Sequence, residues 1–506
     1  MSLFRFSTNS KSCFAEQSKV VLAVGAMVLM LTSCILPSTC LSITCPFTSF
    51  LFAASIVAGI GALAFQLFQI AIESDDSLIP KSLFLQGQKL RAAVLPASTQ
   101  AETITLSKFD ATVTLHRSIS EIGDVDWEAL VPEDKIFLHK NYLQALEQEP
   151  PENAEFRYCA IRKDNEVIGV AYFQLLELSL EELGNDVNPK LLQLALAPRD
   201  ALLGKRVADS KVRVLMCGNA LLSGEYGFCY CDSIAPDDAF DGLCELMEKV
   251  AQKESREGRI TFYTIKDFCP DTPGHALALQ NSGYHKLTVE PAMNVTLSRT
   301  WKEFSDYMDA MSSKYRQRVR SARKKAKAIT RKELQSEDIL SESTRIEELF
   351  HAVLDKAGFR LSAMRAEGFA SLKNALGDSF RFRGYYLEDK MIGFSVALIS
   401  PSLVDAHLVG IDYEHNRKYA TYQNMLYDFV ELGIENRCDS VHMGRTALEI
   451  KSTVGAVAQD LVFYMRHANP VVNRFLRPLL SLAPTKEWTP RHPFKEPITP
   501  AKELQA

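Results

Sequence analysis

The stretch from Lys314 to Lys332 lacks acidic residues: it holds ten Lys or Arg and no Asp or Glu. The chain as a whole has no such imbalance, because its net charge is −5 with 24% charged residues, and this argues against a general nucleic-acid binder and against a DNA partner. Within the stretch, apolar residues recur every three or four positions, which predicts a helix with one buried stripe; they are Tyr315, Val319, Ala322, Ala326 and Ile329. The remaining basic face is either a solvated helix surface or an anion-binding site.

Cysteines at regular framework spacing are also absent. Of eleven Cys, seven follow residue 110: Cys159, Cys217, Cys229, Cys231, Cys244, Cys269 and Cys438. The pair Cys229 and Cys231 has no second ligand pair at zinc spacing, so we predict no metal site. Reduced, mostly buried thiols in a cytosolic region are the better interpretation.

Two segments near the N-terminus lack charge altogether. Residues 20–36 form a mainly apolar run, and residues 50–72 form a second one of 23 residues, long enough to span a bilayer. Basic residues lie on both outer sides, Arg5, Lys11 and Lys19 before the first run and Lys81, Lys89 and Arg91 after the second. Positive flanks favour a transmembrane hairpin with both ends, and the soluble part of the chain, in the cytoplasm. We therefore predict a membrane-anchoring region with its linker over residues 1–105.

The first run has two alternative interpretations. It could be a cleaved signal sequence, because Leu31-Thr-Ser-Cys34 resembles a bacterial lipoprotein cleavage box. It could also belong to an organelle-targeting leader, since the first 15 residues are Ser-rich and lack acids.

The soluble region contains one pattern twice. FRYCAIRKDNEVIGVAYFQ, from Phe156, aligns without a gap with FRFRGYYLEDKMIGFSVAL, from Phe380, and each predicts a β-hairpin with a charged turn. Each hairpin is followed by a strand, an amphipathic helix and another strand: 212–217, 240–254 and 259–265 in the first copy, and 406–411, 421–435 and 440–443 in the second. This predicts two α/β modules with mixed sheets, at 106–295 and 336–470, joined by a basic helical arm at 296–335.

Two further segments have simpler interpretations. The loop 218–227 contains three Gly and could present backbone N–H groups to a phosphate, but it matches no defined phosphate-loop pattern. Glycines required by turns are the alternative. Residues 471–506 are rich in Pro, and Arg491–Lys495 is expected to be an extended surface strap.

A hairpin that leads to a long strand, a helix and a further strand resembles the core of the GNAT acyltransferase superfamily. The doubled module resembles the Fem family of aminoacyl-transferases and the related BioF2-like acetyltransferases, on the arm KYRQRVRSARKKA and the segment GRTALEIKSTVGA at 444–456. The resemblance implies two tandem GNAT-like modules and transfer of an acyl group from acyl-CoA, or of an aminoacyl group from tRNA, to an amine.

One turn departs from the GNAT pattern. The superfamily's pyrophosphate loop is rich in Gly, whereas the corresponding turn here, His415–Ala420, contains none. Arg417 and Lys418 could hold a phosphate through their side chains instead. The departure favours the Fem side of the superfamily, whose donor is an aminoacyl-tRNA.

Candidate site residues gather in the second module. Glu414 or Asp412 could act as a base through water, and Tyr422 could protonate the leaving group. For the Tyr, apolar packing is the alternative, and His407 on the strand 406–411 is more simply a structural histidine. Four cations could bind donor or substrate: Arg445 and Lys451, which follow the strand 440–443, and Lys314 and Arg316 at the start of the arm.

Together these features predict a membrane-anchored N-acyltransferase that uses acyl-CoA or aminoacyl-tRNA. Its acceptor would be an amine on a small molecule or on a cell-envelope or lipid-linked precursor, and the second module, at its border with the first, would be the active one. Two alternatives come from other classes: a catalytically inactive, membrane-tethered binding module, and a sequence-blind RNA-binding protein that uses the basic arm.

Overall fold

The computed structural model describes residues 102–480 and 488–498, apart from 152, 181–205, 207–209, 256–257, 273 and 358–361. Both apolar runs predicted to form the membrane hairpin lie outside these residues. Within the described part of the chain, no helix combines the length and the apolar character that crossing a membrane requires.

The first sheet has nine strands in the order β1-β2-β3-β4-β5-β7-β16-β8, with β6 paired to β4. These strands are β1 (Glu102–Leu106), β2 (Ala111–His116), β3 (Ala154–Lys163), β4 (Glu166–Ser179), β5 (Lys211–Cys217), β6 (Phe228–Tyr230), β7 (Phe262–Phe268), β8 (His285–Thr288) and β16 (Val462–His467). Its helices are α4 (Asp124–Glu128), α5 (Lys140–Gln148), α8 (Pro236–Glu254), α9 (His275–Asn281) and α18 (Pro470–Leu480). The β3–β4 turn places Asp164 and Asn165 at positive φ, as a two-residue hairpin loop requires.

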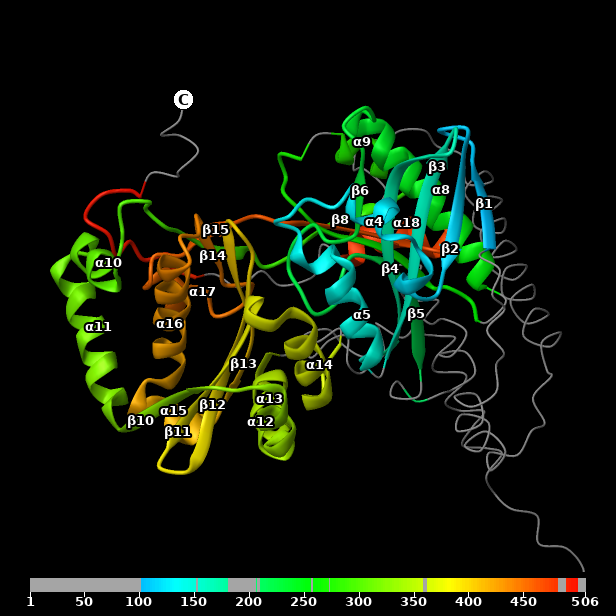
Figure 1. Cartoon of the computed structure of the whole chain (residues 1–506). Coiled ribbons are helices and arrows are strands. Elements are labelled where there is room, and N and C mark those ends of the chain that lie inside the picture. Colours follow the sequence, from blue (N-terminus) through cyan, green and yellow to red (C-terminus); the bar gives the residue numbers. More distant parts are fainter. Residues whose placement is uncertain are drawn as a thin grey trace, which may run out of the picture. The chain divides into compact units, whose positions relative to one another are not determined.

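The second sheet has seven strands in the order β10-β11-β12-β13-β14-β9-β15. They are β9 (Ala292–Thr296), β10 (Ile329–Glu333), β11 (Phe380–Leu387), β12 (Lys390–Ile399), β13 (Leu403–Ile411), β14 (Ser440–His442) and β15 (Val457–Gln459). Helices α10 (Phe304–Ala310), α11 (Ser313–Lys325) and α16 (Thr421–Glu435) lie on one face, and α12 (Ser336–Ser341), α13 (Ser343–Ala357) and α14 (Ala366–Leu376) lie on the other (Figure 1). Helices α15 (Tyr413–Tyr419) and α17 (Leu448–Ser452) are short.

The predicted duplication is present in both sheets. In each, a hairpin (β3–β4 or β11–β12) is followed by an antiparallel strand (β5 or β13) and then, after helix α8 or α16, by a parallel one (β7 or β14). This order of hairpin, strand, helix and strand is the one predicted from the sequence, so the predicted mixed α/β class with two mixed sheets is confirmed.

Two short strands join the sheet of the other module. Strand β9, which spans the predicted boundary at 295, pairs with β14, and β16, which lies inside the predicted second module, pairs with β7 and β8. Local sequence patterns do not show which of the two sheets a strand joins, because an apolar strand can pair in either sheet.

The predicted apolar stripe of the arm is buried, with Tyr315, Val319 and Ala322 each at most 8% exposed. However, the region 296–335 is not one continuous helix. Helix α11 ends at Lys325, and Ile329 begins strand β10, which pairs with β11. Before α11, helix α10 begins with a capping box in which Glu303 is the N-cap and Asp306 is its partner.

Candidate functional site

A basic pocket of about 440 Å³ lies between α11 and the start of α16. It is lined by Lys314, Gln317, Arg318, Ser321, Ala322 and Lys325 of α11 and by Ala420 and Gln423 at the start of α16. Positions 314, 318, 321 and 325 share one face of a helix because they recur every three or four residues. The pocket therefore receives three cations from a single helix face.

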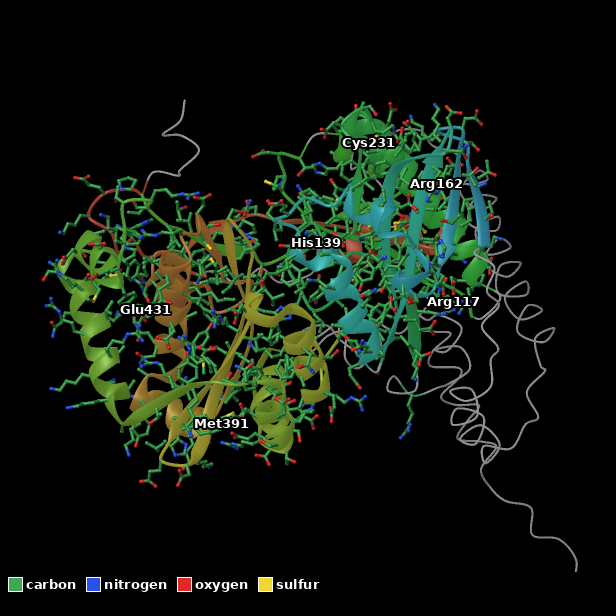
Figure 2. The ribbon with its side chains drawn as sticks, viewed as in Figure 1. Arg117, His139, Arg162, Cys231, Met391 and Glu431 are labelled. Atoms are coloured by element: carbon green, nitrogen blue, oxygen red, sulfur yellow. The ribbon has the colours of Figure 1, made fainter. Side chains whose placement is uncertain are left out.

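Three other cations of the arm already have acidic partners. Arg323 pairs with Asp428 and with Glu431, the latter at 3.0 Å (Glu431 is labelled in Figure 2), and Arg331 pairs with Asp428 at 2.9 Å. Arg316 lies 3.3 Å from Asp309. By contrast, in the described part of the chain Lys314, Arg318 and Lys325 have no acidic partner within ion-pair distance. Unpaired cations around a pocket attract an anion, because no protein carboxylate competes for them.

The start of α16 adds to this positive field. A helix of 15 residues carries a partial positive charge at its N-terminus. Its N-cap, Ala420, has φ 52° and ψ 42°, a left-handed conformation that usually calls for Gly, and its side chain cannot accept a hydrogen bond from the first turn. Although this turn contains no Gly, its last residue, Ala420, has a left-handed conformation. Ala420 directly precedes α16 and lines the pocket.

Strand β13 leaves part of one edge open in the second sheet. It pairs with β14 only from Leu403 to Asp405, and in the described residues no strand pairs with that edge from Ala406 to Ile411. The register with β12 shifts at His407, which is a β-bulge. The side chain of His407 is only 1% exposed although the residue as a whole is partly exposed, so its main chain reaches solvent. Open main-chain groups can hydrogen-bond a ligand that lies along the strand.

A second set of groups follows β14. In the loop that links β14 to α17, Gly444, Thr446 and Ala447 all have positive φ, which is uncommon for Ala and strained for a β-branched Thr. Lys451 is buried and donates to the carbonyl oxygens of Gly444 and Arg445. Burial lowers the pKa of Lys451 to about 7. Arg445 forms an ion pair with the buried carboxylate of Asp267 at the end of β7, and burial lowers its pKa to about 10.

The acid and base candidates are placed less favourably. Asp412 caps α15 by accepting from the Glu414 N–H at 3.1 Å, and it bonds Arg345 at 2.8 Å. Although partial burial opposes the shift, the bonds from His415 and Arg345 hold the pKa of Asp412 below its usual value. Glu414 is exposed, and burial raises the pKa of Tyr422. Asp412 is thus a cap and ion-pair partner, which is a weaker position for a base than the sequence suggested.

The same carboxylates form the one group among the described residues with metal-ligand spacing: atoms of Asp412, Glu414 and His415 lie within 4.8 Å of one another. Because Asp412 already bonds Arg345 and caps α15, we interpret this group as a helix start. Arg417 and Lys418, at the exposed end of α15, do not line the basic pocket, and Lys418 lies over the ring of Tyr419.

Three backbone amides of the glycine loop 218–227 donate hydrogen bonds to side chains of the protein itself. The N–H of Gly224 donates to Asp267, that of Ala220 to Gln174 and that of Leu221 to the Asn219 side chain. These amides are therefore not available to a phosphate, which favours the structural interpretation of the glycines.

Sequence reasoning missed two cations of the basic pocket. Arg318 and Lys325 share the face of Lys314 and could have been selected by their spacing in the arm.

Comparison with known proteins gives similarity of fold. No protein-family model and no curated protein matches the sequence. Among solved structures, one titled "Crystal structure of FemX" is 12% identical with a TM-score of 0.43, covering 70% of this chain and 98% of that one. A tandem GNAT protein of the clavulanic acid biosynthesis pathway is 12% identical with a TM-score of 0.40, over 66% of this chain and 89% of that one.

A third structure, from Agrobacterium fabrum, is named "C-terminal Domain (DUF2156) of Putative Lysylphosphatidylglycerol Synthetase". It is 8% identical with a TM-score of 0.34, over 53% of this chain and 82% of that one. Likenesses at this level do not transfer an activity or a substrate to this chain.

Proposed function

We propose that the protein is an N-acyltransferase whose second module binds a phosphate-bearing acyl donor. The observation that carries the proposal is the basic pocket, where Lys314, Arg318 and Lys325 meet the N-terminus of α16. The helix belongs to the same unit as β13, whose open edge can hold the acyl arm of the donor. The donor is acyl-CoA or aminoacyl-tRNA, since both carry phosphates and an activated carbonyl.

The reaction needs a neutral amine and a stabilised oxyanion. The acceptor ammonium loses one proton to a base, its nitrogen attacks the carbonyl carbon, and the bond to the leaving sulfur or oxygen breaks. The second proton of the nitrogen passes to the leaving atom, giving an amide and a free thiol or hydroxyl. Main-chain N–H groups on the open edge of β13 can stabilise the oxyanion.

We further propose that the apolar runs at 20–36 and 50–72 anchor the enzyme in a membrane, with the two modules on the cytoplasmic side. Their length and lack of charge support this. A membrane-bound enzyme would meet cell-envelope or lipid-linked amines most readily.

Thermal denaturation with acetyl-CoA, longer acyl-CoAs and bulk tRNA tests the proposal. A ligand that binds only the folded state adds about 3 kcal/mol of stability at a hundredfold excess over its Kd. A rise in the midpoint with an acyl-CoA supports the thioester donor, and a rise with tRNA alone supports aminoacyl transfer or plain RNA binding. No shift with any of them favours an inactive module.

A further inference from the structure

The C-terminal strap, Arg491–Lys495, is attached to the start of helix α11. Two main-chain hydrogen bonds and an antiparallel bridge connect the strap to the residues directly before this helix: Ser312 N–H to the carbonyl oxygen of Pro493 at 2.8 Å, Lys495 N–H to the carbonyl oxygen of Ala310 at 3.0 Å, and the bridge of Met311 with Phe494. In Figure 1 the strap, drawn in red, runs beside α10. The corner between α10 and α11 is therefore held by a segment that lies almost at the end of the described chain.

The side chain of Phe494 packs on the same corner. Its ring centroid lies 5.8 Å from that of Trp301, which precedes α10, and 5.7 Å from that of Tyr307, which lies in α10 and is fully buried. The ring also lies so close to Gly455 that a Cβ on this glycine would be 2.4 Å from it. Phe494 therefore anchors the strap to the helix that leads into α11.

The first turn of α11 lacks a side-chain cap. Ser312 is the N-cap, but its side chain makes no capping hydrogen bond. The first N–H groups of a helix have no intrahelical partner, so an uncapped start is less stable than the middle of the helix. Lys314 is the second residue of α11, whereas Arg318 and Lys325 lie in later turns, on either side of which the fully buried Val319 packs into the core. Of the three pocket cations, Lys314 is therefore the one whose position depends most on the strap.

We propose that Phe494 is a positioning residue for the acyl donor: by packing the strap on α10, it holds the first turn of α11 so that Lys314 lines the donor pocket. Phe494 itself does not line the pocket, so it acts on the donor through Lys314. This inference rests on the proposed function and adds a residue that controls the affinity of the donor site. Because coupling between two sites is reciprocal, the bound donor also stabilises the docked strap.

A purely structural role of the strap is the alternative, since Phe494 also packs against the core of the second module. The two roles differ in how loss of the Phe494 ring combines with loss of a pocket cation. If Phe494 acts through Lys314, removal of Lys314 also removes the effect of Phe494 on donor binding. Removal of Lys325, about three turns further along α11, leaves that effect in place. If Phe494 only supports the fold, its effect is the same in both backgrounds.

The test measures the Kd of acetyl-CoA for the full chain by calorimetry, or the Kd of bulk tRNA if only tRNA binds. Phe494→Ala should raise the Kd at least about threefold in the native and Lys325→Ala backgrounds, but less than about twofold in the Lys314→Ala background, because only independent effects add. Phe494→Leu keeps an apolar side chain and should raise the Kd less than Phe494→Ala. Phe109→Ala, which removes a buried ring from the core of the first sheet, is the matched control and should leave the Kd within about twofold.

Hydrogen exchange gives a second readout that needs no variant of the strap. The same donor should slow exchange of the Ser312 and Lys495 N–H groups in the native protein and not in Lys314→Ala, since both groups bond across the contact between strap and helix. Equal rises of the Kd in the Lys314→Ala and Lys325→Ala backgrounds, an unchanged Kd in Phe494→Ala, or exchange that the donor does not slow would overturn the positioning role. If neither acetyl-CoA nor tRNA binds the native protein, the proposed function is contradicted, and this inference with it.

Discussion

The fully buried carboxylate of Asp267, at the end of β7 in the first sheet, forms an ion pair with Arg445, which follows β14 of the second sheet. The other oxygen of Asp267 contacts the Lys266 ammonium at 2.5 Å and accepts from the Gly224 N–H at 3.2 Å. Asp267 itself has φ 69°. The carboxylate of Asp267 therefore links the glycine loop 218–227 of the first module to the loop between β14 and α17 of the second module.

Replacing Asp267 by Asn should destabilise the protein strongly, because two buried cations would lose their counter-charge. We expect the free energy of unfolding to fall by about 3–5 kcal/mol in chemical denaturation. Glu177→Gln, which breaks the exposed pair with Lys211, is the control and should change it by less than about 1 kcal/mol. Similar effects of the two substitutions would show that Asp267 does not hold the loops together.

The lowered pKa of Lys451 predicts how the free energy of unfolding depends on pH. Its folded-state pKa, about 7, lies below the ordinary value of 10.5, so between these pH values the unfolded chain binds more protons than the native one. The free energy of unfolding should therefore rise with pH in this window, by up to about 1.4 kcal/mol per unit.

Lys451→Met keeps the length of the side chain and removes the titration, so the difference in stability between variant and native protein should depend on pH. Lys266, whose pKa burial also lowers, is present in both proteins and cancels in the comparison. A difference that stays constant from pH 7 to 10 would contradict the lowered pKa of Lys451.

The C-terminal strap gives a packing prediction. Residue 494 forms a bridge with Met311, the N–H of Ser312 donates to the carbonyl of Pro493 at 2.8 Å, and a Cβ on Gly455 would lie 2.4 Å from the Phe494 ring. Gly455→Ala should destabilise the protein, because it adds this clash to a φ of 97°. In a Phe494→Ala background the same substitution should cost at least about 1 kcal/mol less, as measured by a double-mutant cycle. Additive effects would mean that Phe494 does not pack on Gly455.

Local patterns predicted most of the fold. The duplicated hairpins, the helix Thr421–Glu435 and the buried stripe of α11 follow from periodicity and turn chemistry, which act over a few residues. The exchange of β9 and β16 could not be predicted, since it depends on which sheet edge each apolar strand meets.

The site was predicted in part for a similar reason. The sequence marked Lys314 as a candidate because it belongs to an unusual run of charge, and the structure places it in the basic pocket. Arg316 belongs to the same run, but its side chain forms an ion pair with Asp309. Which cation has a partner is decided by contacts between distant segments, such as that of Arg323 with Asp428.

Binding of an acyl-CoA to the native protein and to two paired charge variants tests the central claim most directly. Lys325→Ala with Arg318→Ala removes two pocket cations, whereas Lys324→Ala with Arg320→Ala removes two from another face of α11. We expect the first pair to raise the Kd, measured by calorimetry, at least about 10-fold, since a hydrogen bond to a charged group contributes about 1.5–3 kcal/mol. The second pair should leave it within about twofold, as expected for screened surface charges. Equal losses in the two variants, or no binding by the native protein of either acyl-CoA or tRNA, would contradict a donor site between α11 and α16.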